Sequence, residues 1–173
     1  MTRQTLRMRV FAGPNGSGKS TIINAVRKSK VKGIPVDFGI YINADDIAKR
    51  LRKGKVTFKQ YRVSVKEQEF LKIVSESGLL NKEFTLTAFK KSYSLKDNQL
   101  ILLNEKADER IAQIIADFLR KKLLLEKRKF SFETVFSHTS KIEIMKSAIE
   151  AGYKVYLYFV STESPEINKF RVK

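Results

Sequence analysis

Residues 13–20 restrict the fold of this chain more than any other segment, because they form a complete phosphate-binding loop. Their sequence, Gly-Pro-Asn-Gly-Ser-Gly-Lys-Ser, fits the Walker A pattern G-x-x-x-x-G-K-[ST]. The apolar segment Arg7–Ala12 precedes the loop and predicts a strand, while Thr21–Arg27 follows it with the spacing of a helix. This order of strand, loop and helix is the context in which the motif binds nucleotides, so we expect a nucleoside triphosphate as ligand.

The residue types of the loop suit phosphate chemistry. Its three glycines allow the backbone to curl so that several N–H groups point at the phosphates. Lys19 supplies a charge for the β- and γ-phosphates, and Ser20 supplies a hydroxyl for Mg²⁺. The helix N-terminus behind the loop favours anions through its dipole and its free N–H groups. The predicted nucleotide site comprises Gly13, Pro14, Asn15, Gly16, Ser17, Gly18, Lys19, Ser20 and Thr21.

Composition limits the class of protein. With 173 residues, 42% of them hydrophobic, the chain is long enough for one core, and we expect a single domain over residues 1–173. The absence of cysteine excludes a disulfide scaffold and a thiolate metal site. No apolar run approaches the roughly 20 residues of a spanning helix, and the N-terminus lacks a signal-peptide core. We therefore expect a soluble cytoplasmic protein without a membrane partner.

The net charge of +17 is the second strong signal, because such a field attracts polyanions. Nucleotide phosphates, sugar nucleotides, RNA and an acidic partner protein all fit this charge. The basic clusters are spread along the chain, which favours a solvated basic surface over one nucleic-acid patch. These clusters are Lys28–Lys32, Lys49–Lys53, Arg120–Lys122 and Lys127–Lys129.

Strands and helices alternate outside the middle of the chain. After the first strand, further strands are predicted at 39–42, 129–134 and 153–160. A helix over Thr139–Ala151, with Gly152 at its C-cap, joins the last two strands into a βαβ unit. Such units give parallel strands covered by helices. The pattern and the loop predict an α/β fold of the P-loop NTPase class, with a parallel sheet flanked by helices.

Residues 54–106 depart from this alternation and predict a helical insertion. Helical spacing occurs at 68–74 and 85–89, with breaks at 75–78 and 92–94, and Asp97 is placed to cap a further segment toward Leu103. Two interpretations stay open, a wall for a substrate or simple core and lid packing. A long helix is then predicted over 105–122, with an apolar stripe formed by Ile111, Ile114, Ile115, Phe118 and Leu119.

Polar residues at the strand ends carry the candidate chemistry, because open parallel sheets bind ligands there. Asp45 follows the second strand and Glu133 closes the third, so both are expected near Lys19. We predict that Asp45 accepts the proton of an attacking hydroxyl and that Asp46 caps the next helix. The alternative for Glu133 is a strand-end residue held by a lysine. His138, the only histidine, is predicted to be structural.

Three segments in this order resemble the zeta-toxin family of P-loop kinases. They are the loop with its flanks over 12–21, the run Ile42-Asn43-Ala44-Asp45-Asp46-Ile47-Ala48, and Phe132-Glu133-Thr134-Val135-Phe136-Ser137. The segment 151–160 is also similar to that family. The resemblance covers most of the chain apart from the insertion, and the ordered set of motifs is more specific than the loop alone.

The resemblance implies a five-stranded parallel sheet and an ATP- and Mg²⁺-dependent kinase acting on the 3′-hydroxyl of UDP-N-acetylglucosamine. Asp45 matches the catalytic base of the family, and Lys19, Ser20 and the loop match its ATP site. The substrate side corresponds to Asn43, Asp46, Glu133 and Thr134. A toxin of this kind would pair with an antitoxin protein. In the family, arginines beyond the last strand close over the phosphates, whereas this chain ends soon after Arg171. Either the chain is a truncated form, or Arg171 and a surface lysine take that role.

Two other functions fit the loop. A nucleic-acid kinase would attract its substrate through the positive field, and its binding would weaken steeply with salt. A non-catalytic ATP-binding module would bind ATP and be indifferent to Asp45→Asn.

Overall fold

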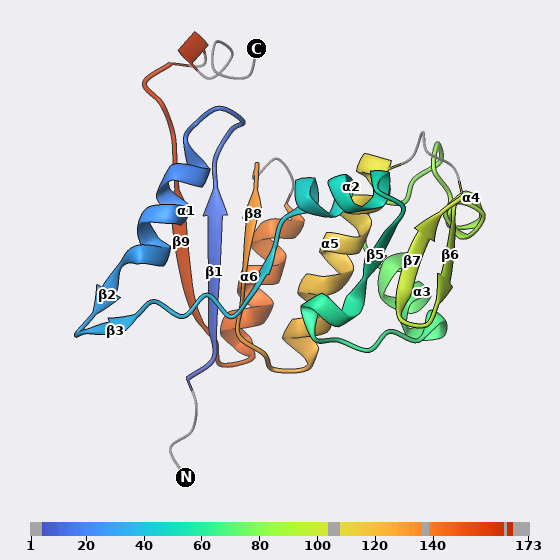
Figure 1. Cartoon of the computed structure of the whole chain (residues 1–173), viewed down its shortest axis with the longest axis horizontal. Helices are drawn as coiled ribbons and strands as arrows, with labels where there is room; N and C mark the ends of the chain where they lie inside the picture. The colour runs from blue at the N-terminus through green and yellow to red at the C-terminus, as the bar shows by residue number, and fades with distance from the viewer. Residues whose placement is uncertain (1–4, 104–107, 136–138, 165, 168–173) are drawn as a thin grey trace. The chain divides into compact units, whose positions relative to one another are not determined.

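The computed structural model describes residues 5–103, 108–135, 139–164 and 166–167 (Figure 1). The chain divides into two compact units. The first unit joins Met1–Tyr41 to Lys127–Lys173, and the second unit is Ile42–Glu126. No helix among the described residues is long and apolar enough to cross a membrane.

The first unit is built on a parallel four-stranded sheet, which confirms the α/β class. The strand order is β4-β8-β1-β9, and β1 pairs in parallel with both β8 and β9. The connection from β8 to β9 therefore passes over β1. The described residues contain four strands in this sheet, not the five that the resemblance implied. The strands are β1 (Arg7–Ala12), β4 (Ile40–Ile42), β8 (Phe130–Thr134) and β9 (Lys154–Phe159), as the sequence predicted to within one residue.

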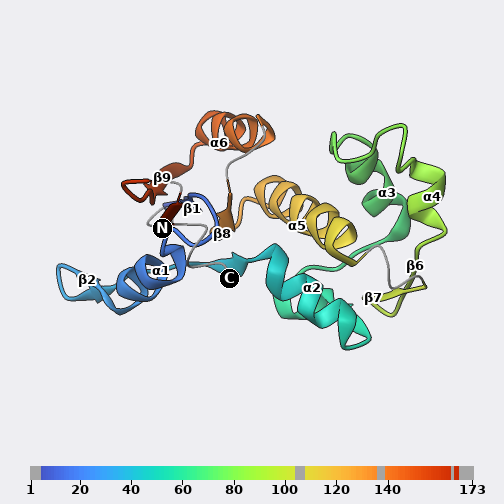
Figure 2. The ribbon, with the colours of Figure 1, turned by 90° about the horizontal axis from the view of Figure 1, so that it is seen from above.

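Two helices flank this sheet. Figure 2 shows α1 (Lys19–Lys28) and α6 (Ser140–Glu150) on opposite faces of β1, β8 and β9. The predicted C-cap is one residue off: Ala151 is the C-cap of α6, and Gly152 follows it with φ 85°. Its N–H donates to Ile149 O at 2.9 Å, and the next N–H donates to Ala148 O at 2.9 Å, the pattern of a Schellman motif. A short hairpin of β2 (Lys30–Val31) and β3 (Ile34–Pro35) follows α1.

The second unit combines helices with a small sheet of its own. In it, α2 and α3 pack against the long helix α5. The apolar stripe predicted for α5 is confirmed, because its five residues are fully buried. That helix begins at Asp108 in the structure, and the predicted start at Glu105 lies outside the described residues. The helices are α2 (Ala44–Arg52), α3 (Glu67–Ser75), α4 (Leu86–Lys90), α5 (Asp108–Leu125) and the 3-10 helix η1 (Phe58–Tyr61).

The helices predicted at 68–74 and 85–89 are present as α3 and α4, but residues 54–106 also form a three-stranded antiparallel sheet that the prediction of a helical insertion missed. Its order is β5-β7-β6, formed by β5 (Lys55–Thr57), β6 (Tyr93–Lys96) and β7 (Gln99–Leu102). Asp97 does not cap a helix. Asp97 and Asn98 have φ values of 51° and 59° and form the two-residue turn between β6 and β7, and positive φ at both positions is what tight hairpins require.

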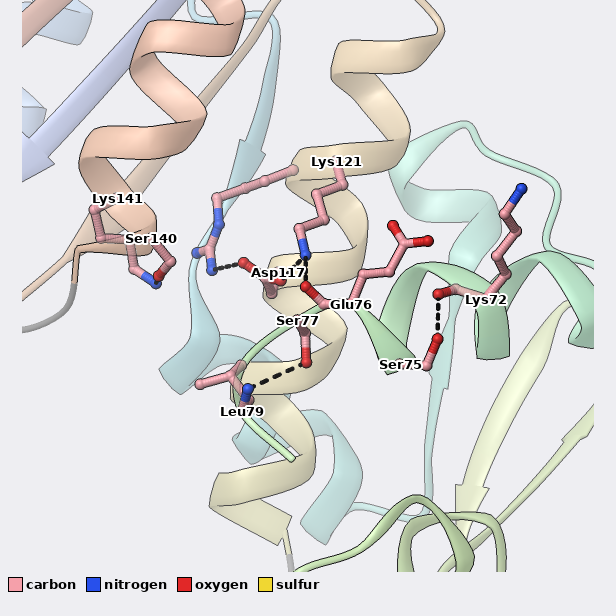
Figure 3. Close-up of polar contacts among 10 residues, drawn as sticks. Lys72, Ser75, Glu76, Ser77, Leu79, Asp117, Lys121, Ser140 and Lys141 are labelled. Carbon is pink, nitrogen blue, oxygen red and sulfur yellow. Dashed lines mark hydrogen bonds and ion pairs between the residues drawn. The ribbon is translucent and has the colours of Figure 1, made fainter. Parts of the chain in front are cut away.

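Polar contacts fix α5 against the segment after α3 (Figure 3). The carboxylate of Asp117 is buried on α5 and pairs with Arg120 at 3.2 Å and with Lys121 at 3.1 Å. Lys121 Nζ also donates to Glu76 O at 3.1 Å. Burial lowers the pKa of the Arg120 guanidinium, and the adjacent carboxylate opposes this shift. Removing Asp117 would therefore take away a carboxylate that compensates a buried charge.

Candidate functional site

The phosphate-binding loop connects β1 to α1 and depends on glycine at its first position. Gly13 has φ 150°, and a Cβ atom there would lie 2.1 Å from Val160 O, so any larger residue would push the loop away from β9. The Gly13 N–H donates to Thr134 O at 3.2 Å, which ties the loop to the end of β8. Gly16 and Gly18 have φ values of 77° and 93°, which other residues rarely adopt. The loop therefore has the glycine-dependent curvature that the motif predicted.

The helix N-terminus after the loop is suited to an anion. Gly18 is the N-cap of α1, and no side chain caps this end of the helix. Ser20 and Thr21 lie exposed in the first turn. N–H groups in a first helical turn lack partners within the helix, and the helix dipole adds partial positive charge there. This geometry is compatible with an anion site at residues 13–21, which stays a prediction.

The side chain of Lys19 lies within the curve of the loop. Its Nζ donates to Gly13 O and Pro14 O, each at 2.9 Å, and lies 3.8 Å from Glu133 Oε1. Only 7% of the Lys19 side chain and 16% of the Glu133 side chain are exposed. The prediction that Glu133 lies close to Lys19 is confirmed, and a largely buried ammonium and carboxylate face each other at the loop.

Ser17 adds an unsatisfied donor to the same loop. Its side chain is buried, and among the described residues its Oγ has no hydrogen-bond partner. A buried hydroxyl without a partner destabilises a fold by roughly 1–3 kcal/mol. Such a group is expected where a ligand completes the hydrogen bonding, and it lies within the predicted nucleotide site.

Tyr41 orients the Glu133 carboxylate, a contact that sequence reasoning missed. Its hydroxyl donates to Glu133 Oε2 at 3.0 Å, while the other carboxylate oxygen faces Lys19. The Arg27 guanidinium of α1 lies 4.5 Å from the centre of the Tyr41 ring, a cation–π contact. Arg27, Tyr41, Glu133 and Lys19 thus form a continuous series of contacts. The sequence feature that could have indicated this contact is the position of Tyr41 in the short strand before Asn43.

A second set of contacts fixes the segment that carries Tyr41. The Asp37 carboxylate accepts from Lys129 Nζ at 2.8 Å and from the Gly39 N–H at 2.9 Å. These hydrogen bonds lower the pKa of Asp37, so it stays ionised. A Cβ at Gly39 would lie 2.2 Å from Lys129 O, so glycine allows the close approach of this segment to the start of β8.

We expect Tyr41→Phe to lower the free energy of unfolding of the first unit, because the substitution removes the hydrogen bond to Glu133. A hydrogen bond to a charged group contributes about 1.5–3 kcal/mol. In urea unfolding, a double-mutant cycle of Tyr41→Phe with Glu133→Gln should give a coupling free energy of at least about 1 kcal/mol. Tyr158→Phe is the matched control, because that ring stacks on Phe11 and its change should be additive with Glu133→Gln. Additive effects of Tyr41→Phe and Glu133→Gln would show that the contact contributes nothing.

Asn43, Asp45 and Asp46 lie at the N-terminus of α2, in the second unit. The prediction that Asp46 caps this helix is wrong. Asn43 is the N-cap, with extended backbone angles, and its Oδ1 accepts from the Asp45 N–H at 2.8 Å. Asp46 instead forms an exposed ion pair with Lys49 at 3.9 Å. Asp45 is exposed in the first turn, and its approach to Lys19 stays a prediction.

The described residues do not include Phe136, Ser137, His138 or Arg171, which the sequence analysis named. The roles predicted for them stay predictions. Thr134 is described, and its carbonyl holds the loop at Gly13.

Comparison with known proteins identifies no relative. No family model matches the chain. No curated protein and no solved structure is significantly similar to it. The resemblance to the zeta-toxin family therefore depends on the ordered motifs alone.

Proposed function

We propose that the chain is an ATP-dependent kinase of the zeta-toxin type, which transfers a phosphoryl group to a hydroxyl of a sugar nucleotide such as UDP-N-acetylglucosamine. The observation that carries this proposal is the geometry around Lys19. A glycine-dependent loop surrounds a buried ammonium, and a carboxylate follows it at the end of the neighbouring strand. Fold alone would not support an activity, so the proposal depends on these side chains.

The residues present fit a bound nucleotide and magnesium ion. The loop N–H groups and Lys19 would hold the phosphates, the unsatisfied Ser17 hydroxyl lies in the same loop, and Ser20 would offer its exposed hydroxyl to Mg²⁺. A magnesium ion bound there neutralises charge on the transferred phosphoryl group. Lys19 must leave the carbonyls of Gly13 and Pro14 when it turns toward a phosphate, and the nearby Glu133 keeps its charge compensated until then.

The acceptor side of the proposal assigns one proton transfer. Asp45 would accept the proton of the attacking hydroxyl while the hydroxyl oxygen bonds to the γ-phosphorus of ATP. The bond from that phosphorus to the bridging oxygen breaks at the same time, and ADP leaves with the electron pair. Glu133 and Thr134 would orient the acceptor at the end of β8. The first unit carries 17 Lys and Arg but only 6 Asp and Glu, so its field attracts an anionic acceptor. On the same resemblance, we propose a cytoplasmic toxin that is held inactive by an antitoxin.

We expect Asp45→Asn to lower the rate of transfer by about 10²–10⁴-fold while ATP binding persists. General acid–base groups contribute about 10²–10⁴-fold to a rate, and the amide cannot accept the proton. The measurement is mass spectrometry of UDP-N-acetylglucosamine incubated with MgATP and either protein, beside titration calorimetry with ATP. Asp97→Asn is the control, because it makes the same chemical change in the β6–β7 turn, where positive φ suits asparagine.

Each outcome separates the candidate functions. Product that disappears only in Asp45→Asn supports the kinase and its base. If only a 5′-hydroxyl oligonucleotide is phosphorylated, the acceptor is a nucleic acid and not a sugar nucleotide. ATP binding without product on either acceptor would contradict the kinase and leave an ATP-binding module.

A further inference from the structure

One segment of the second unit is strongly basic. Residues 49–62, here called the basic segment, run from the second half of α2 through β5 and η1. The segment contains no Asp or Glu. All of its basic side chains are exposed, and they are Lys49, Arg50, Arg52, Lys53, Lys55, Lys59 and Arg62.

The charge of the second unit is concentrated in this segment. Residues 42–126 contain 18 Lys and Arg and 12 Asp and Glu. Without the 7 basic residues of the basic segment, the remaining unit has 11 basic and 12 acidic residues and is close to neutral. The net positive charge of the second unit therefore comes from the basic segment.

The apolar residues of the basic segment all point into the core. Leu51, Val56, Phe58 and Tyr61 are each at most 6% exposed, and α2 packs beside β5. The segment is therefore a folded surface in which buried apolar side chains alternate with exposed basic ones. Burial raises the pKa of Tyr61 to about 12, so its hydroxyl stays neutral and adds no negative charge there.

This composition distinguishes among the partners that a positive surface can bind. Protein interfaces depend on apolar and aromatic anchors, and membrane-surface helices need an exposed apolar face. The basic segment exposes neither, because its exposed residues other than Lys and Arg are Gly54 and Gln60. Nucleic-acid interfaces are polar and strongly positive, and their affinity comes mainly from phosphate contacts.

We propose that the basic segment binds the phosphodiester backbone of a nucleic acid without reading its bases. Among the contacts of the described residues, Lys49 pairs with Asp46 at 3.9 Å and Arg52 pairs with Glu109 at 4.0 Å. In each pair both side chains are more than half exposed, and such pairs contribute little stability, so a phosphate can replace the carboxylate. The surface lies wholly within the second unit and does not depend on the nucleotide site or on the proposed kinase activity.

The test compares two variants with the same loss of charge in the same unit. One replaces Lys49, Arg50, Lys53 and Lys55 of the basic segment with Gln. The control replaces Lys82, Lys90, Lys91 and Lys96 with Gln, and these are also exposed. Fluorescence anisotropy with a labelled single-stranded RNA, single-stranded DNA and duplex DNA of about 20 nucleotides, at several salt concentrations, gives the affinity and its salt dependence.

We expect the full chain to bind, and the basic-segment variant to bind at least tenfold more weakly at about 0.1 M salt while the control changes little. The slope of log K against log salt should become shallower by about 3 for single strands or about 3.6 for duplex, since each phosphate contact contributes about 0.7 or 0.9. The three probes show which form of the backbone is preferred. Circular dichroism of both variants checks that they fold.

Three results would overturn the proposal. Equal weakening by both variants would assign binding to the diffuse field. Absence of binding by the full chain at about 0.1 M salt would exclude the interface. Displacement of the oligonucleotides by polyglutamate at equal charge concentration would assign the surface to an acidic protein. Lys19→Ala should leave oligonucleotide binding unchanged, so a failure here is distinguishable from a failure of the proposed kinase.

Discussion

Lys19→Ala is expected to weaken ATP binding about 10–100-fold and to lower any phosphoryl transfer by about 10²–10³-fold. A hydrogen bond to a charged group contributes about 1.5–3 kcal/mol, and each 1.4 kcal/mol is a factor of ten in affinity. The larger effect on rate arises because an electrostatic donor matters most where charge develops in the transition state. Titration calorimetry with MgATP measures the first effect and initial rates measure the second.

A second lysine of α1 provides the control for the loss of one positive charge. Lys28 lies exposed in the last turn of α1, so Lys28→Ala removes the same charge far from the loop and should leave ATP affinity unchanged. Lys19→Arg is the second comparison. A guanidinium keeps the charge but is planar and larger than the ammonium held between Gly13 O and Pro14 O, so it should restore only part of the affinity. Unchanged ATP affinity in Lys19→Ala would show that the loop is not the nucleotide site.

The sheet of the first unit could be predicted because its strands carry strong local signals. Buried parallel strands appear as continuous apolar runs, and Arg7–Ala12 is of this kind. Lys154–Phe159 is a partly exposed edge strand, and its aromatic and β-branched residues predicted it. The phosphate-binding loop added the strand before it and the helix after it. Gly152 marked the end of α6, since only glycine adopts the required positive φ at no steric cost.

The sheet of the second unit could not be predicted with the same rules. Its strands have three or four residues, too few to establish a period of two, and the turn between β6 and β7 is Asp97-Asn98 without a glycine. Aspartate before a short apolar run predicts a helix N-cap and a hairpin turn equally well. The hairpin forms, and not the helix, because β7 also pairs with β5. These strands lie more than 40 residues apart in the sequence, so local rules do not predict their pairing.

Only those parts of the candidate site that depend on short stretches of sequence could be predicted. The loop, Lys19 and Glu133 follow from motif and strand position. The Tyr41 hydrogen bond joins residues 92 apart in the sequence, and no local pattern marks it. Asn43, Asp45 and Asp46 are all residue types that cap helices. Asn43 is the N-cap of α2 because its backbone is still extended, whereas the residues after it are helical.

Phe70→Ala should destabilise the second unit by about 3–5 kcal/mol, the range for removing a buried aromatic ring. Phe70 is completely buried, and its ring lies near four others. The ring centroids are 4.8 Å from Phe118, 5.5 Å from Tyr93, 5.8 Å from Phe89 and 6.1 Å from Phe58. Truncation would therefore leave a cavity at the centre of the cluster and remove several edge-to-face contacts together.

Urea unfolding followed by circular dichroism measures this loss, and Phe159→Ala is the matched control. Phe159 is 60% exposed on β9, so the same truncation removes little buried area and should change stability by less than about 1 kcal/mol. A loss below about 1 kcal/mol in Phe70→Ala would show that the aromatic cluster does not hold the second unit together. A large loss would mean that the basic segment depends on this cluster for its shape, because Phe58 belongs to that segment, is buried and packs on Phe70.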